Sequence, residues 1–250
     1  MRFIIFGGGC YGSFYARQLQ RAARAGRPVT EIRVVDRNEM PAARQLPDSV
    51  LLQFVQQDWD AFCDVYFPSL ALDSTDQLVP PPFIPHLPVR WLLRRLTAAR
   101  PNLSWSTEPI RRLPGTPFQH QSAGGPLTLS HADWICPVHC IEPGRCPITR
   151  GPRYWDIART LEIWSEALAE AGQPIEQTHL FQCLHYSHGV GTYPAATVAA
   201  AYRALAAAHA TPGAPARFLV GTVSHCHGAI HLLKAEAGTD TVSSRTVHLD

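Results

Sequence analysis

Three cysteines lie close together in the middle of the chain, in a segment that reads D-W-I-C-P-V-H-C-I-E-P-G-R-C-P-I-T. They are Cys136, Cys140 and Cys146, and His139 stands between the first two. Two of them precede prolines, which have a fixed φ and no amide proton, so the segment predicts a stiff, non-helical loop. Thiolates are the usual ligands of iron–sulfur clusters and of structural zinc. We therefore interpret the segment as a metal-binding loop that holds a [4Fe–4S] cluster or zinc.

The loop supplies one thiolate fewer than a four-cysteine site needs. A [4Fe–4S] cluster would take its fourth ligand from elsewhere, such as Cys226 or Cys183, whereas zinc would be completed by a histidine. The cysteine spacing is neither a pair of zinc-ribbon knuckles nor a standard ferredoxin run. Two other interpretations therefore stay open. The cysteines are reduced residues of a proline-rich connection, or one of them is a redox-active or nucleophilic thiol.

A second pattern with chemical meaning stands near the first residue. The apolar run Phe3–Phe6 predicts a buried strand, and the turn G-G-G-C-Y-G follows it directly. A helix is predicted over Ser13–Ala25, with Gly26 as its stop signal, and a second strand over Ile32–Val35. The order of strand, glycine turn, helix and strand is that of a βαβ unit.

With Gly7, Gly9 and Gly12 in the spacing G-x-G-x-x-G, this unit resembles the fingerprint of Rossmann-type NAD(P)- and FAD-binding proteins. The resemblance implies that Gly7 makes the tight turn, that Gly9 lets the backbone approach a pyrophosphate, and that Gly12 lets the helix pack on the strand. It also places Cys10 and Tyr11 beside the cofactor, at a helix N-terminus whose amides and dipole favour phosphate. The implied cofactor is NAD or NADP.

The end of the second strand bears on the choice between these cofactors. Asp36 matches the acidic position of the fingerprint and would accept hydrogen bonds from ribose hydroxyls, which favours NAD, whereas Arg37 leaves NADP open. The gap from Gly12 to Asp36 is longer than usual, and Cys10 is an unusual residue at its place. The alternatives are a glycine turn whose pocket is empty, or one that binds S-adenosylmethionine.

Four histidines follow two predicted strands in the second half of the chain. The strands span His179–His185 and Phe218–Val223, and a helix over Tyr193–His209 with Thr192 as its N-cap separates them. Such a unit predicts parallel strands that end at one edge of the sheet, where ligands of open α/β sheets bind. The four candidate catalytic residues are His185, His188, His225 and His227.

The alternation of residues after the second of these strands adds a detail. If the chain remains extended from Ser224 to Gly228, His225 and His227 point to one face and Cys226 to the other. The histidines would then act as acid, base or ligand, and Cys226 would complete the cysteine set. A single histidine is more often structural, so this interpretation depends on their clustering.

The remaining pattern predicts an α/β protein with a Rossmann-like, mostly parallel sheet, helices on both faces and an irregular proline- and cysteine-rich middle region. We divide the chain into a nucleotide-binding unit (1–100), a Pro/Gly/Cys-rich insertion (101–153), a βαβ-containing part (154–237) and a tail (238–250). Further helices are predicted over Trp59–Phe67, Pro88–Ala99 and Tyr154–Ala171, and further strands over Leu51–Val55, Gln77–Val79, Leu103–Trp105, Leu127–Leu129 and Ala229–Leu233.

Composition excludes several classes of protein. Hydrophobic residues make up 46% of the chain and charged residues 17%, so a core can form. The formal charge of +2 is too small to indicate a nucleic-acid surface. No apolar run is long enough to cross a bilayer, and no secretory signal is recognisable. Seven cysteines without such a signal predict a reducing, cytoplasmic environment.

Together these patterns predict an NAD(P)-binding oxidoreductase with a cysteine-ligated metal centre near its nucleotide site. Its partner would be a small molecule or a redox protein. A non-catalytic sensor of NAD(H) or of redox state would carry the same two sites without turnover. An S-adenosylmethionine-dependent transferase would use the glycine turn alone.

Overall fold

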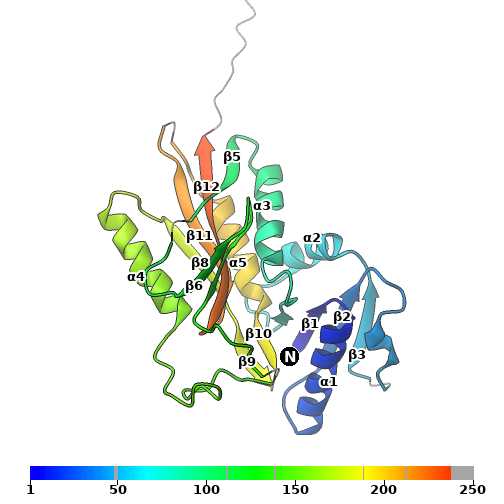
Figure 1. Cartoon of the computed structure of the whole chain (residues 1–250). Helices are drawn as coiled ribbons and strands as arrows, with labels where there is room; N and C mark the ends of the chain where they lie inside the picture. Colours follow the sequence, from blue (N-terminus) through cyan, green and yellow to red (C-terminus); the bar gives the residue numbers. More distant parts are fainter. Residues whose placement is uncertain (48–49, 111, 138, 188, 212, 238–250) are drawn as a thin grey trace, which may run out of the picture.

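Two mixed β-sheets organise the chain, and helices lie between them and on their outer faces (Figure 1). The computed structural model describes residues 1–47, 50–110, 112–137, 139–187, 189–211 and 213–237. The predicted α/β class is confirmed, but both sheets are mixed, whereas one mostly parallel sheet was predicted. Among the described residues, no helix is long and apolar enough to cross a membrane.

The N-terminal sheet has the strand order β3-β2-β1-β4-β10-β9. Its first four strands are parallel, β10 is antiparallel to β4, and β9 is antiparallel to β10. Two strands from late in the chain therefore complete a sheet that the first residues begin. The strands are β1 (Arg2–Phe6), β2 (Glu31–Asp36), β3 (Leu52–Gln56), β4 (Gln77–Val79), β9 (Leu184–Ser187) and β10 (Val190–Pro194).

The C-terminal sheet has the order β6-β7-β12-β11-β8, and β5 pairs with the second half of β12. Strands β8 and β11 are parallel, as the helix between them predicted, and β12 returns antiparallel to β11. The strands are β5 (Leu103–Glu108), β6 (Phe118–Gln121), β7 (Leu127–Ser130), β8 (Gln177–Gln182), β11 (Ala216–Val223) and β12 (His227–Ala237).

Three helices lie between the sheets, and one covers each outer face. One continuous core joins Phe67 of α2, Trp91 of α3 and Val198 of α5 to Ile4 of β1 and Phe218 of β11. Helix α1 packs on the other face of the N-terminal sheet, and α4 on the other face of the C-terminal sheet. The helices are α1 (Cys10–Arg24), α2 (Trp59–Ser69), α3 (Leu87–Ala99), α4 (Ile157–Glu170), α5 (Ala195–Ala206) and the 3-10 helix η1 (Ala42–Gln45).

The strand predicted over His179–His185 is two strands in different sheets. β8 ends at Gln182, and the backbone amide of Cys183 donates to the carbonyl of Val223 at 2.6 Å. The chain then leaves the C-terminal sheet and enters the N-terminal sheet as β9. His185 therefore lies within a strand and not beyond the end of one.

The predicted start of the following helix is also wrong. Thr192 belongs to β10, where its hydroxyl donates to the Gln77 side chain at 3.2 Å, and the helix begins at Ala195 after Pro194. The middle region is less irregular than predicted, because β5, β6 and β7 join the C-terminal sheet. Its longest part without helix or strand, among the described residues, runs from 131 to 156.

A buried histidine in β12 is expected to make the stability of the protein depend on pH. His231 is 7% exposed, and neither ring nitrogen has a hydrogen-bond partner among the described residues. Burial, with a smaller effect from the neighbouring His86, lowers the pKa of His231 to about 4. As pH falls below about 6.5, the ordinary pKa of a histidine, His231 becomes protonated in the unfolded chain but stays neutral in the folded protein. We expect a loss of roughly 3 kcal/mol of unfolding free energy between about pH 6.5 and pH 4.

Urea denaturation at a series of pH values measures this loss. His231→Leu should flatten the dependence in that range, since the side chain no longer titrates. His209→Gln alters an exposed histidine and should leave the dependence as it is. If the unfolding free energy falls with pH by the same amount in the unmodified protein and in His231→Leu, the prediction is contradicted.

Candidate functional site

The four cysteines predicted as metal ligands line one pocket of about 210 Å³. Three come from the loop between β7 and α4, and the fourth from the turn between β11 and β12. Backbone bonds hold the loop against the turn: His131 donates to the carbonyl of Cys226 at 2.9 Å, and Ile157 to that of His225 at 3.1 Å. The four residues are Cys136, Cys140, Cys146 and Cys226.

The cysteine loop is fixed by its own backbone. The amide of Cys140 donates to Pro137 at 2.8 Å, and the amide of Cys146 to Gly151 at 2.9 Å. Glu142 and Arg150 adopt φ angles of 48° and 57°, which are uncommon for residues with a side chain. Such conformations persist where the surrounding structure imposes them, and they are concentrated at functional sites.

Hydrogen-bond donors point at two of the sulfurs. The indole N–H of Trp155 donates to Sγ of Cys226 at 3.2 Å, and the amide of Glu142 donates to Sγ of Cys140 at 3.3 Å. Burial raises the pKa of the Cys226 thiol to about 11, although the indole opposes the shift. Donors to sulfur stabilise a thiolate, which is the form that binds a metal.

The other two sulfurs also have donors beside them. Burial raises the pKa of the Cys146 thiol, but the amides of Thr149 and Ile148 and the Thr149 hydroxyl lower it by more. Burial raises the pKa of Cys136, and the Trp134 indole opposes the shift. That indole N–H does not reach hydrogen-bond geometry with any described acceptor, although it is buried. An acceptor in the pocket would satisfy it.

Two of the candidate histidines line the cysteine pocket. They are His185 of β9 and His227 at the start of β12, and burial lowers the pKa of both. His227 Nδ1 lies 3.0 Å from the hydroxyl of Ser130. His188 lies outside the described residues.

The expectation of an extended chain from Ser224 to Gly228 is wrong. The amide of Ser224 donates to the carbonyl of His227 at 2.7 Å, which closes a tight turn between the two antiparallel strands. The turn places Cys226 and His227 on the cysteine pocket, whereas His225 lines the neighbouring cavity.

A network of carboxylates holds this turn in place. Glu142 accepts from the hydroxyl of Ser224 at 2.7 Å and from the amide of His225 at 3.0 Å. Asp156 caps α4 with one oxygen, which accepts from the amide of Ala158 at 2.8 Å. Its other oxygen lies 2.7 Å from His225 Nδ1. A carboxylate in that position fixes the orientation of the ring.

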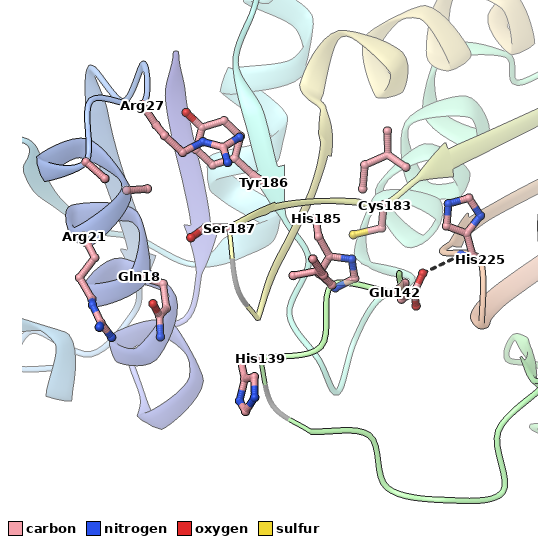
Figure 2. Close-up of a pocket in the computed structure, with 14 residues that line it drawn as sticks. Gln18, Arg21, Arg27, His139, Glu142, Cys183, His185, Tyr186, Ser187 and His225 are labelled. Atoms are coloured by element: carbon pink, nitrogen blue, oxygen red, sulfur yellow. Dashed lines mark hydrogen bonds between the residues drawn. The ribbon is translucent and has the colours of Figure 1, made fainter. Parts of the chain in front are cut away.

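A second and larger cavity adjoins the cysteine pocket. Its volume is about 950 Å³, and it lies between α1 on one side and β9 with the cysteine loop on the other (Figure 2). Glu142 and His185 line both cavities. Cys183 lines the larger cavity and not the cysteine pocket, so Cys226 is the better placed fourth thiol.

The glycine turn adopts the backbone that its pattern requires. Gly7 has a φ of 92°, and a Cβ on Gly12 would collide with the carbonyl of Gly7. A Cβ on Gly9 would meet nothing within 4 Å, so space is open beside the backbone there. Within the described residues, no hydrogen bond uses the amides of Gly9, Cys10, Tyr11 or Gly12. Gly9, Cys10 and Tyr11 are exposed, so their amides are free to bind an anion, whereas Gly12 is buried.

Asp36 stands beside the glycine turn. Its carboxylate accepts from the amide of Gly8 at 2.7 Å and from the amide of Asn38 at 2.8 Å, and each oxygen keeps a further lone pair. Arg37 is exposed, and Tyr11 is 43% exposed with its ring against Phe83. The glycine turn lines neither the cysteine pocket nor the larger cavity.

Residues 89–236 match the family model AF_1314_C, which is described as "Uncharacterized protein, C-terminal domain". The chain belongs to this family. The AF_1314_C match extends from α3 into β12 and so includes the cysteine loop and Cys226, while the glycine turn precedes it. No curated protein and no solved structure matched the chain.

Several residues of this site carry no signal in the sequence. Glu142 and Asp156 are ordinary acidic residues until the fold brings them to His225, and Trp155 is an ordinary aromatic residue until it meets Cys226. Only the position of Glu142 inside the cysteine segment could have suggested a role. Arg21 of α1 lines the larger cavity from another part of the chain.

Proposed function

We propose that the cysteine pocket holds a [4Fe–4S] cluster and that the glycine turn binds NAD(P), so that the chain is an NAD(P)-binding redox protein. The observation that carries this proposal is the meeting of four cysteines, from two segments far apart in the sequence, around one pocket. Buried cysteines of an ordinary core would not need N–H donors beside each sulfur.

The size of the cysteine pocket supports a cluster over a single zinc ion. Four thiolates around zinc stand about 3.8 Å apart, since the Zn–S bond is about 2.3 Å and the geometry tetrahedral. A cluster separates its thiolates by iron and sulfide. The pocket of about 210 Å³ is several times the volume of one water, which suits a group of several atoms.

The N-terminal unit supports dinucleotide binding. Its parallel strands follow the order β3-β2-β1-β4, which is the first half of a Rossmann sheet, and the glycine turn lies where the strand order reverses. The free amides at the start of α1 suit a pyrophosphate, and Asp36 suits the ribose hydroxyls. The dinucleotide would supply hydride chemistry, and the cluster single-electron transfer.

Metal and sulfide analysis of anaerobically purified protein tests the proposal. We expect about four iron and four sulfide per chain, with brown colour and broad visible absorption. One zinc per chain in a colourless protein would favour a structural site without redox chemistry. Protein with neither metal after reconstitution with iron and sulfide would overturn the proposal.

A further inference from the structure

The cavity between α1 and β9 has the dimensions of a ligand site. Its volume of about 950 Å³ lies at the upper end of the range for small-molecule pockets. One wall is formed by the second half of α1, and the other by β9 and the cysteine loop. Figure 2 shows Gln18 and Arg21 side by side on α1, with His185 and His139 on the opposite wall.

The charges on these walls are mostly of one sign. Arg21 and Arg27 bring two guanidinium groups, and no described carboxylate forms an ion pair with either. Arg27 lies 4.2 Å above the ring of Tyr186, which holds its planar head in place. Glu142 is the acidic residue of the lining, and both its oxygens already accept from Ser224 and His225.

Histidines add further donors on the side toward the cysteine pocket. His139 and His225 line the cavity, and His185 lines both the cavity and the cysteine pocket. A molecule held by Arg21 of α1 and by Arg27, which follows the helix, would therefore have its other end beside His185, next to the four cysteines. Guanidinium groups bind carboxylates and phosphates through paired, charge-assisted hydrogen bonds.

We infer that this cavity binds a small molecule with two or more negative charges, held by Arg21 and Arg27, as the substrate of the neighbouring redox centre. The inference deepens the proposed function by naming a substrate class, and it rests on that function in calling the molecule a substrate. The shared chemistry is that of a polycarboxylate or a phosphate ester. Either carries oxygen pairs that match a guanidinium fork.

Isothermal titration calorimetry on the full chain tests the inference with two probes. Tricarballylate represents a polycarboxylate, and glycerol 2-phosphate represents a phosphate ester. Binding of either supports the site and identifies the source of the charge, and binding of both supports a general anion site. Glycerol, which lacks the charge, should not bind. Absence of heat with both anions at millimolar concentration overturns the inference.

A matched pair of variants shows where the anion binds. Arg21→Gln removes a guanidinium from the cavity wall and should weaken binding at least about tenfold. Arg24→Gln removes the same charge from the same helix at an exposed position that does not line the cavity, and should change affinity less than about twofold. Equal losses in the two variants would indicate a general charge effect and would overturn the assignment.

The iron content separates this inference from the proposed function. Arg21→Gln should keep the full iron and sulfide content, because Arg21 does not line the cysteine pocket. If the protein contains iron but binds neither anion, the proposed anion site is contradicted and the proposed cluster is supported. If the protein contains no iron but binds tricarballylate through Arg21, the anion site is supported and the redox proposal is contradicted.

Discussion

Replacing Cys226 by serine is expected to remove at least half of the iron from anaerobically purified protein and most of its visible absorption. Cys226 is the thiolate that the C-terminal sheet brings to the pocket, and it is 9% exposed. A cluster that loses one of four thiolates keeps an exposed iron and becomes labile. If the loop alone held zinc through Cys136, Cys140 and Cys146 with a histidine, the same change would leave the metal in place.

The control for this experiment is Cys10→Ser. Cys10 is exposed at the start of α1 and lines neither cavity, so its replacement should leave the iron content unchanged. Circular dichroism of both variants shows whether the sheets remain folded. Full iron content in a folded Cys226→Ser protein would exclude Cys226 as a ligand and redirect attention to His185, which lines the same pocket.

The cysteine loop could be predicted in part from the sequence. Proline fixes φ after Cys136 and Cys146, so a rigid loop with several sulfurs follows from local chemistry. Cys226 depends on the pairing of β11 with β12, which places its turn on the loop. The sequence alone favours Cys226 as the fourth thiol and leaves Cys183 as an alternative. The structure separates them, because β8 and β9 belong to different sheets and Cys183 lies at the crossing.

Local sequence pattern predicts the contiguous parts of the sheets but not the pairing of strands that are distant in the chain. The βαβ unit at the start was predicted because its strands, turn and helix are contiguous and strongly patterned. Strands β9 and β10 were not predicted as strands of the first sheet, because they are short and polar and they pair with each other and with the distant β4. The side chains of Glu142 and Asp156 are likewise placed by long-range contacts. Sequence pattern does not encode such contacts residue by residue.

Gly9 and Gly12 of the N-terminal turn should respond to substitution in opposite ways, and Gly12→Ala should be the more damaging to the fold. A Cβ on Gly12 would collide with the carbonyl oxygen of Gly7 and lie 2.9 Å from its carbonyl carbon. Both are backbone atoms of the turn that joins β1 to α1, so relief requires the helix to move off the sheet. We expect a loss of about 3 kcal/mol or more in unfolding free energy. Thermal melts should show a decrease of roughly 10 °C for a chain of this size.

Gly9→Val is the counterpart, because a Cβ on Gly9 would meet nothing within 4 Å. Its unfolding free energy should change by no more than about 1 kcal/mol, the scale of a changed N-cap. If a pyrophosphate lies against the turn, the valine occupies its space, and affinity for NADH or NADPH should fall at least about tenfold. Fluorescence titration with each dinucleotide, and calorimetry with S-adenosylmethionine, measure this loss on a protein shown by its melt to be folded. If Gly9→Val binds the dinucleotides with unchanged affinity, the glycine turn does not bind the cofactor. The open space beside Gly9 would then require another ligand.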